Sequence, residues 1–167
     1  MKNADCVHPC PCGWYGSPTR PCTCSESTVT KYQKRISGPL MDRIDIHIHV
    51  PTVDYEKLTD QRTGEPSKKV RERVEAARER QRARFSGLND ITSNADMHPA
   101  EVRKFCQLDA ACTNLMKTAM SQLQLSARAY HRVLKLARTI ADLAGSEKIG
   151  PGHLAEALQY RPRMNDG

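Results

Sequence analysis

One arginine and a group of cysteines are the residues whose type and spacing best suit chemistry. Arg43 stands directly before residues 44–50, in which Ile and Val alternate with polar residues. Alternation with period two is typical of a strand with one buried face, so we expect a strand over residues 46–50 with Arg43 just before its start. A guanidinium is always protonated and presents a planar fork of donors that fits a phosphate or a carboxylate. The alternative is a surface ion pair of Arg43 with Asp42 or Asp45.

Four of the seven cysteines form two close pairs, Cys10-x-Cys12 and Cys22-x-Cys24, joined by a loop rich in Gly and Pro. Thiolates are soft ligands that match zinc, and the loop is too short to build an apolar core of its own. These four cysteines therefore predict a tetrahedral zinc site. The alternative is a set of reduced cysteines without metal, because most zinc knuckles use Cys-x-x-Cys.

Other cysteines and histidines bear on the same question. Cys6 and His8 lie close enough in sequence to replace one zinc ligand, whereas Cys106 and Cys112 fall in a helical pattern and are interpreted as packing residues. His47 and His49 form a His-x-His pair that metal-dependent hydrolases of the barrel type use at a strand end. Such barrels need about 250 residues and further ligands, so we favour a solvated strand face for this pair.

Composition narrows the class of protein. The 167 residues carry a net charge of +7 and only 5% aromatic residues, which predicts a small core of aliphatic side chains. No apolar run approaches the roughly 18 residues that a membrane span needs, and the N-terminus shows no apolar signal segment. We expect a cytoplasmic protein with no membrane partner, and reduced rather than disulfide-bonded cysteines.

The second half of the chain reads as a helical bundle. Apolar residues recur at spacings of three and four over residues 99–108, 109–123, 126–143 and 151–159, with Gly145 and Gly150 in the last break. Ser126 is the expected N-cap of the third helix. Residues 51–66 show no sustained period and are interpreted as a connecting segment.

A strongly basic helix is expected between the connecting segment and the bundle. Ser67 is a fair N-cap, and residues 68–84 hold eight basic side chains against three acidic ones, which gives +5 of the chain's +7. This helix could face nucleic acid. The alternative is a solvated helix joined by Glu-to-Arg pairs three and four residues apart.

Five segments together resemble one protein family over almost the whole chain. They are residues 9–13 (PCPCG), 35–45 (RISGPLMDRID), 71–78 (RERVEAAR), 125–132 (LSARAYHR) and 155–161 (AEALQYR). In this order they resemble the magnesium-chelatase-like AAA+ ATPases, the bacterial family that includes the competence-associated DNA branch-migration helicase. The resemblance implies a mainly α chain: the remnant of an α/β AAA+ core, with the Cys-rich loop and one strand, followed by a helical AAA+ lid bundle.

The resemblance also implies roles for single residues. Arg43 matches the arginine finger that reaches into the ATP site of the neighbouring subunit in a ring. Arg128, in the first turn after Ser126, matches the sensor of the γ-phosphate in its own subunit, although spacing alone favours an exposed arginine there. Arg132, one turn later, could support a phosphate or an acidic neighbour. His8 stands where the family usually carries a water-orienting Asn, so a sensor role at His8 is in doubt.

The chain contains no Gly-x-x-x-x-Gly-Lys-Ser/Thr and no apolar strand that ends in paired acids. Alone, it is not expected to hydrolyse ATP, and we interpret it as the final third of a larger protein. Its expected domains are residues 1–50 (end of the ATPase core), 51–95 (connecting segment and basic helix) and 96–163 (lid).

The resemblance implies ATP and Mg in the complete protein, a homo-oligomeric ring such as a hexamer, and DNA as a partner. The sequence also leaves open a free-standing zinc-containing basic module that binds nucleic acid, and a domain without activity until it is docked.

Overall fold

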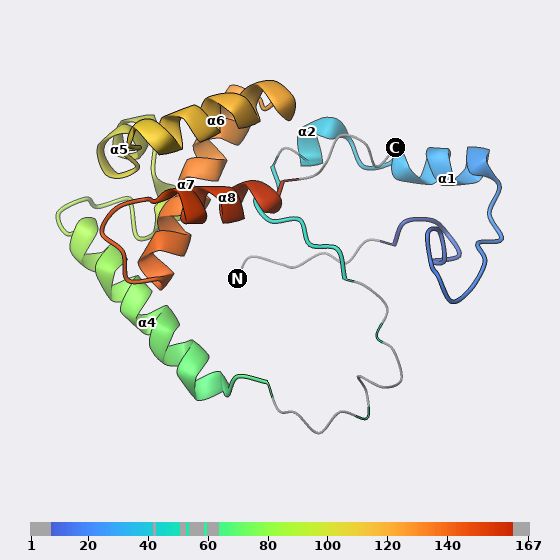
Figure 1. Ribbon diagram of the computed structural model, residues 1–167, viewed down its shortest axis with the longest axis horizontal. Helices are drawn as coiled ribbons and strands as arrows, with labels where there is room; N and C mark the ends of the chain where they lie inside the picture. Colours follow the sequence, from blue (N-terminus) through green and yellow to red (C-terminus); the bar gives the residue numbers. More distant parts are fainter. Residues whose placement is uncertain (1–7, 42, 51–52, 54–58, 60–63, 162–167) are drawn as a thin grey trace.

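The structure is a computed structural model, which describes residues 8–41, 43–50, 53, 59 and 64–161. Within those residues it contains helices and no strand, so the mainly α prediction is confirmed (Figure 1). The elements, in chain order, are α1 (Glu26–Gln33), α2 (Gly38–Met41), α4 (Ser67–Arg84), the 3₁₀ helix η1 (Asn94–Asp96), α5 (Pro99–Phe105), α6 (Ala110–Gln122), α7 (Ala127–Leu143) and α8 (Pro151–Gln159). No helix of the described residues is long and apolar enough to cross a membrane.

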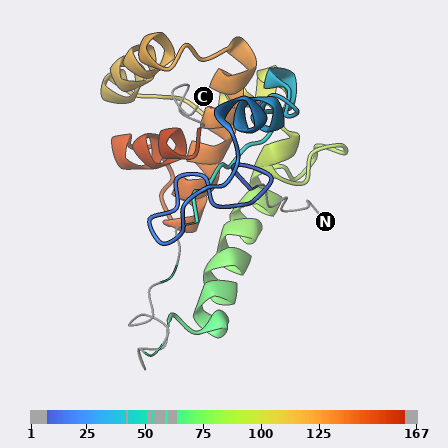
Figure 2. The ribbon, with the colours of Figure 1, turned by 90° about the vertical axis from the view of Figure 1, so that its right-hand side faces the viewer.

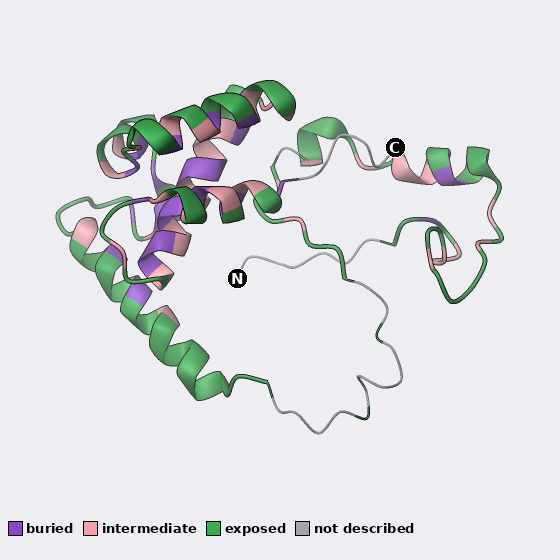
Figure 3. Cartoon of the chain, viewed as in Figure 1, coloured by how far each residue is buried: buried purple, intermediate pink, exposed green. Residues whose placement is uncertain are grey.

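Helix α7 is the centre of the bundle. Helices α4, α5, α8 and the short η1 pack against it, and α6 packs against α8. The buried residues lie mainly along α7 and on the elements packed against it, whereas α1 and α2 are largely exposed (Figure 3). The core contains the fully buried Leu154 of α8, with Val102 of α5 and Val133 of α7. The aliphatic core expected from the low aromatic content is therefore present.

The bundle helices lie where the periodicity predicted them. Ser126 caps α7 as expected, because its hydroxyl accepts a hydrogen bond from the Ala129 N–H at 3.1 Å. Asp109 caps α6 in the same way through the Cys112 N–H at 2.7 Å. The first expected helix is shorter than predicted, since α5 ends at Phe105 rather than at residue 108. Helix ends are set by capping contacts that periodicity does not encode.

Helix α4 begins one residue earlier than expected. Its N-cap is Pro66, and Ser67, predicted to be the cap, is the first helical residue. The N-terminal half of α4 projects away from the bundle in two perpendicular views (Figures 1 and 2). Its two buried residues, Ala77 and Gln81, lie in its C-terminal half, where Gln81 accepts a hydrogen bond from the Asn94 N–H of η1 at 3.0 Å, and Phe85 follows in the core.

The strand expected over residues 46–50 is not formed. This segment runs past the end of α8 without a ladder, and one backbone hydrogen bond, from the His47 N–H to the Tyr160 carbonyl at 2.9 Å, joins it to the bundle. Ile48 is 68% exposed and Val50 is 81% exposed. A strand needs a neighbouring strand to pair with, and the described residues provide none. The apolar alternation is present in the sequence, but no described residue covers Ile48 and Val50 of that face.

Candidate metal and nucleotide sites

The four paired cysteines gather at one point of the loop before α1. Their sulfur atoms all lie within 4.8 Å of one another, and the separations from Cys10 to Cys12, Cys10 to Cys22 and Cys12 to Cys22 are 3.4, 3.7 and 3.5 Å. A tetrahedral metal with metal–sulfur bonds of about 2.3 Å sets sulfur–sulfur separations of about 3.8 Å. The cluster has the size that a single zinc ion requires.

The loop is built to present backbone N–H groups to these sulfurs. The Gly13 N–H donates to the Cys10 carbonyl oxygen at 3.0 Å and closes a turn. The Tyr15 N–H, just after this turn, donates to the Cys10 Sγ at 3.3 Å. Gly13 has a φ of 81°, a left-handed conformation that favours glycine. The Cys24 N–H reaches the Cys22 Sγ at 3.4 Å. Such donors stabilise thiolates, which are the form that binds metal.

The thiols and the backbone around them shift the pKa values of the cysteines. Backbone N–H groups of Trp14 and Thr23 lower the pKa of Cys12 to about 5. The Cys24 N–H lowers the pKa of Cys22, but desolvation and the neighbouring sulfurs of Cys12 and Cys10 outweigh it and raise that pKa to about 12. Four thiolates at this spacing would repel one another, and a cation among them would remove that repulsion. The residues present therefore fit a zinc ion.

The other candidate ligands do not join this cluster. His8 is exposed and is not among the four gathered ligands, and Cys6 lies outside the described residues. Cys106 and Cys112 are buried in the bundle core, which confirms them as packing residues. His47 and His49 gather with no third His, Cys, Asp or Glu of the described chain, so the barrel-type metal site receives no support.

Arg43 lies on the turn that follows α2, and its side chain is exposed. The Arg43 N–H donates to the Leu40 carbonyl at 2.9 Å, which ties the turn to α2. The expected alternative, a pair with Asp45, is not formed: the Asp45 carboxylate accepts from Arg132 instead. Asp42, the other expected partner, lies outside the described residues. Within the described chain the Arg43 guanidinium makes no ion pair and no hydrogen bond.

Arg128 lies in the first turn of α7, as predicted, and is also exposed. No other described residue pairs with its guanidinium. Arg132 follows one turn along α7 and contacts the Asp45 carboxylate and the Arg43 carbonyl oxygen. Of the two partners considered for Arg132, the structure shows an acidic neighbour. The sequence did not indicate that this neighbour belongs to the Arg43 turn.

The basic helix α4 uses many of its charges within the molecule. Arg73 pairs with Glu65, and Arg78 and Arg82 pair with Glu75 or Glu79. Arg80 and Arg84 contact α7 instead. Arg80 donates to the Asp142 carbonyl oxygen at 3.1 Å, and Arg84 donates to the Asp142 carboxylate. Lys68, Lys69 and Arg71 make no ion pair within the described chain. The Glu-to-Arg pairing expected as the alternative is present, and the cations left for an anionic partner lie at the projecting end of α4.

A buried polar network that sequence reasoning missed joins α4, η1 and α7. Asp142 is fully buried and accepts from Arg84 of α4 at 2.7 Å and from Asn94 of η1 at 2.8 Å. Arg138, one turn earlier on α7, pairs with the same carboxylate at 3.2 Å and donates to the Glu147 carbonyl oxygen. Burial raises the pKa of Asp142, but the Arg84 and Asn94 hydrogen bonds and the two guanidinium charges outweigh it, so the pKa is lowered. The network thus joins α4, η1 and α7 through one buried carboxylate.

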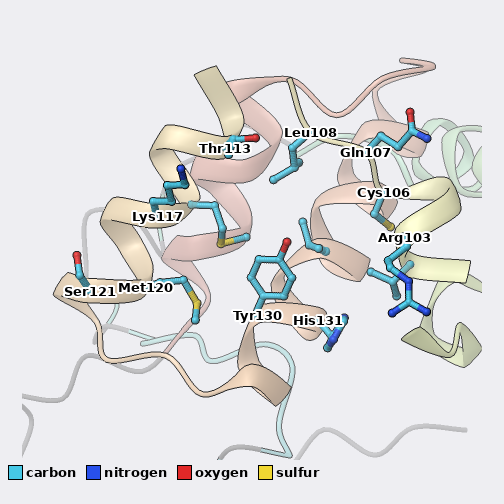
Figure 4. A pocket seen from close by; sticks show the side chains of 13 residues that line it. Arg103, Cys106, Gln107, Leu108, Thr113, Lys117, Met120, Ser121, Tyr130 and His131 are labelled. Atoms are coloured by element: carbon cyan, nitrogen blue, oxygen red, sulfur yellow. The ribbon is translucent and has the colours of Figure 1, made fainter. Parts of the chain in front are cut away.

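A hollow of about 750 Å³ lies between α5, α6 and α7 (Figure 4). Its walls are mainly apolar, with Met120 and Tyr130 on one side and Cys106 on the other, and Arg103 and Lys117 add positive charge. Arg103 is exposed and forms no ion pair in the described chain. None of the four cysteines predicted to bind zinc and neither of the arginines predicted to bind phosphate lines this hollow.

These observations define a class of protein: a helical bundle domain preceded by a Cys-rich segment with metal-site geometry. Comparison with known families gives the particular one. The family described as "Magnesium chelatase, subunit ChlI C-terminal" matches residues 64–161, and "Magnesium chelatase, subunit ChlI" matches residues 4–58. The chain belongs to the magnesium chelatase ChlI family and corresponds to its C-terminal part, which confirms the resemblance found in the sequence.

Curated relatives agree with this assignment. The chain is 40% identical over 158 residues to the "Competence protein ComM" of Haemophilus influenzae, 39% identical over 156 residues to the "Uncharacterized protein YifB" of Escherichia coli, and 34% identical over 157 residues to the "Uncharacterized protein Rv2897c" of Mycobacterium tuberculosis. Each match covers 93% of this chain but only 29–30% of the relative. The chain thus spans less than a third of the relatives it matches.

Proposed function

We propose that this chain is the C-terminal part of a ring-shaped ATPase, in which Arg43 enters the ATP site of the neighbouring subunit and Arg128 serves the site of its own subunit. The observation that carries the proposal is that both guanidiniums are exposed and unpaired within the described chain, while hydrogen bonds fix the backbone that carries each. An exposed guanidinium that has no partner within the chain is suited to bind the phosphate of a nucleotide.

The expected chemistry is stabilisation of charge on the transferring phosphoryl group. An arginine finger contributes about 10³–10⁵ in rate in other phosphoryl-transfer enzymes. Arg128, at the N-terminus of α7, adds its charge to backbone N–H groups that already favour an anion. The phosphate-binding loop and the Mg²⁺ ligands belong to a part of the subunit outside these 167 residues.

The wider assembly is part of the same proposal. In this proposal the ring consists of identical subunits, as in a hexamer. The ring moves DNA. Within the proposed subunit, residues 1–50 form the end of the ATPase core with its Cys-rich loop, residues 51–95 form a connecting segment and the basic helix, and residues 96–163 form the lid. The matches to the ChlI family and to a competence protein support this reading.

A chimera tests the roles of the two arginines. This chain replaces the matching 158-residue region of the Haemophilus influenzae protein ComM, and ATP hydrolysis is measured. We expect hydrolysis by the unmutated chimera, a loss of at least about 10³-fold in Arg43→Ala with nucleotide binding retained, and little change in Arg103→Ala, the matched control. An unmutated chimera without ATPase activity, or full turnover by Arg43→Ala, would overturn the proposal.

Mixed rings separate the two positions. A subunit whose phosphate-binding lysine is replaced but whose Arg43 is intact should restore activity when mixed with Arg43→Ala, because the finger is then supplied across the interface. The same subunit should restore nothing to Arg128→Ala, because no subunit then carries both the phosphate-binding loop and Arg128. Rescue of Arg128→Ala would contradict its assignment to its own site.

We also propose that Cys10, Cys12, Cys22 and Cys24 hold one structural zinc ion. The sulfur separations of 3.4–3.7 Å support it. Metal analysis of the purified chain should find one zinc per chain, lost in Cys12→Ser and retained in Cys106→Ser. Retention of a full equivalent by Cys12→Ser would contradict this ligand set.

A free-standing module that binds nucleic acid remains the alternative function. It predicts DNA binding by this chain alone that weakens steeply with salt, and a loss on replacing the unpaired Lys68, Lys69 and Arg71 with alanine. Because the other charges of α4 are paired or turned toward α7, we expect only weak DNA binding from the isolated chain. Tight, salt-dependent binding would favour the alternative.

A further inference from the structure

The turn that carries Arg43 is attached to the lid rather than standing apart from it. Arg132 of α7 donates to the Arg43 carbonyl oxygen and to the Asp45 carboxylate. Arg161, buried just after α8, donates to the Ile44 carbonyl oxygen at 3.0 Å. The His47 N–H donates to the Tyr160 carbonyl oxygen at 2.9 Å. Residues 43–47 thus meet the bundle at three successive points, which we call the finger clamp.

The clamp involves the same helix face as the proposed nucleotide sensor. Arg128 and Arg132 are four residues apart on α7, and side chains at that spacing are neighbours on one face. Arg128 is exposed, whereas Arg132 is partly buried against the Arg43 turn. The first turns of α7 therefore carry one arginine directed to solvent and a second that holds the backbone of Arg43.

The contact is made to the backbone of the finger and not to its charged group. Arg132 donates a hydrogen bond to the Arg43 carbonyl oxygen, and the Arg43 N–H donates one to the Leu40 carbonyl oxygen. The backbone of Arg43 is therefore fixed on both sides of its Cα. Arg132 also neutralises Asp45, the acidic neighbour that would otherwise compete for the Arg43 guanidinium. Both effects keep Arg43 positioned and unpaired.

We propose that Arg132 is a positioning residue that couples the two ATP sites on either side of a subunit. The inference rests on the proposed function: α7 responds through Arg128 to the nucleotide of its own subunit, and the finger clamp makes the Arg43 turn move with α7. The nucleotide bound in one subunit then sets the position of Arg43, which enters the ATP site of the neighbouring subunit. Arg132 itself touches no phosphate in this scheme.

Hydrogen exchange on this chain tests the clamp without any ATPase. In Arg132→Ala, exchange of the His47 amide and of its neighbours should rise by at least tenfold, while the amides of α7 from residue 133 to 141 keep their protection. Arg103→Ala, an exposed arginine of the same bundle, should change neither. Unchanged exchange at His47 in Arg132→Ala would overturn the clamp. Increased exchange along the whole of α7 would mean that Arg132 supports the fold instead.

Mixed rings of the ComM chimera test the coupling. If Arg132 acts by positioning Arg43, its loss is felt in the neighbouring site, so Arg132→Ala should behave as Arg43→Ala does. A subunit with a defective phosphate-binding loop should rescue it, Arg128→Ala should rescue it, and Arg43→Ala should not. Rescue by Arg43→Ala alone would place Arg132 with the phosphate of its own subunit and overturn the inference.

Conservative variants separate positioning from simple loss of a charge. Arg132→Ala should lower kcat by about 10–100-fold with little change in KM, because nucleotide contacts are kept. Asp45→Ala should lower it less, since Arg132 still holds the Arg43 carbonyl oxygen. The double variant should match Arg132→Ala, and additive losses would contradict a shared contact. If Arg43→Ala is fully active, the proposed function fails; if Arg43→Ala is inactive and Arg132→Ala is fully active, only the coupling fails.

Discussion

The helical bundle from α4 to α8 and the segment before it, residues 8–50, are held by different forces. The bundle buries a continuous core in which Leu154, Ala137 and Ala141 are fully inaccessible. Among the described residues of the earlier segment only Cys10 and Val29 are buried, and the segment relies on the cysteine cluster and the finger clamp. The cysteine cluster and Arg43 lie in the segment that lacks a core, and the unpaired Arg43 guanidinium is tolerated there because solvent or a partner can reach it.

The largest effect that separates the two regions should come from removal of the zinc ion proposed for the four cysteines. Binding to zinc-finger peptides contributes on the order of 10 kcal/mol, so a chelator should unfold the loop around Trp14 completely. The fluorescence of Trp14, the only tryptophan, should change because the loop packs Arg20 over its ring at 5.0 Å. The thermal transition of the helical signal should stay unchanged.

Two cysteine variants sharpen this test. Cys12→Ser should reproduce the effect of the chelator on Trp14 and spare the helical transition. Cys106→Ser, a buried thiol of the bundle core, should do the reverse. A chelator that lowers the helical transition as much as Cys106→Ser does would show that the regions are one cooperative unit.

The next largest effect should be confined to the bundle. Asp142→Asn leaves Arg84 and Arg138 without their carboxylate in a buried site, and breaking such a group costs about 3–5 kcal/mol. Urea unfolding followed by circular dichroism measures it. Glu65→Gln, which breaks the exposed pair with Arg73, is the matched control and should leave the midpoint unchanged. Equal midpoints for the two variants would refute the role of the network.

Apolar truncation in each region gives the most direct comparison. Leu154→Ala opens a cavity in the bundle core and should cost about 2–5 kcal/mol of unfolding free energy. Ile48→Ala removes a similar side chain that is 68% exposed, so it should change stability by less than about 0.5 kcal/mol. A large loss in Ile48→Ala would mean that the uncovered segment packs against the bundle more closely than the structure describes.

Sequence periodicity predicted the bundle because each helix buries its apolar face against another part of the same chain. The Ser126 cap and the start of α8 at Pro151 followed from local rules. The strand over residues 46–50 shows the same kind of pattern but has no described strand to pair with, so the rule gave the wrong element. Helices α1 and α2 are short and bury one residue between them, Val29, so they carried too little periodicity to be detected.

The candidate sites were predictable to a similar degree. The Cys-x-Cys pairs indicated the cluster because all four ligands lie in one loop. The Arg132 contact and the Asp142 network join residues far apart in the chain, and a single sequence carries no signal for such pairs. Asp142 falls on the buried side of α7, where the period predicts an apolar residue, and that mismatch was the one available indication.

Acid should weaken the bundle through the same network. The pKa of Asp142 is lowered in the folded chain, so its stabilisation is fully present above the unfolded value near 3.8 and is lost as the pH falls through the folded value. Asp96, whose pKa is lowered by its Ser93 hydrogen bond, adds to the same trend. The pH dependence of urea midpoints should therefore be shallower, though not absent, in Asp142→Asn. Identical slopes in the two proteins would contradict the assignment.

The smallest effects distinguish two glycines of the bundle. Gly145 follows the C-cap of α7 and has a φ of 75°, and a Cβ there would lie 3.3 Å from an Arg80 side-chain nitrogen, so Gly145→Ala should cost about 1 kcal/mol. Gly152 lies inside α8, where a Cβ would meet nothing within 4 Å, so Gly152→Ala should stabilise by about 0.4–1 kcal/mol. Urea midpoints should therefore move in opposite directions. A loss in both variants would place a contact at Gly152 that the bundle does not show, and a gain in both would mean that Arg80 and the end of α7 relax around the new methyl group at no cost.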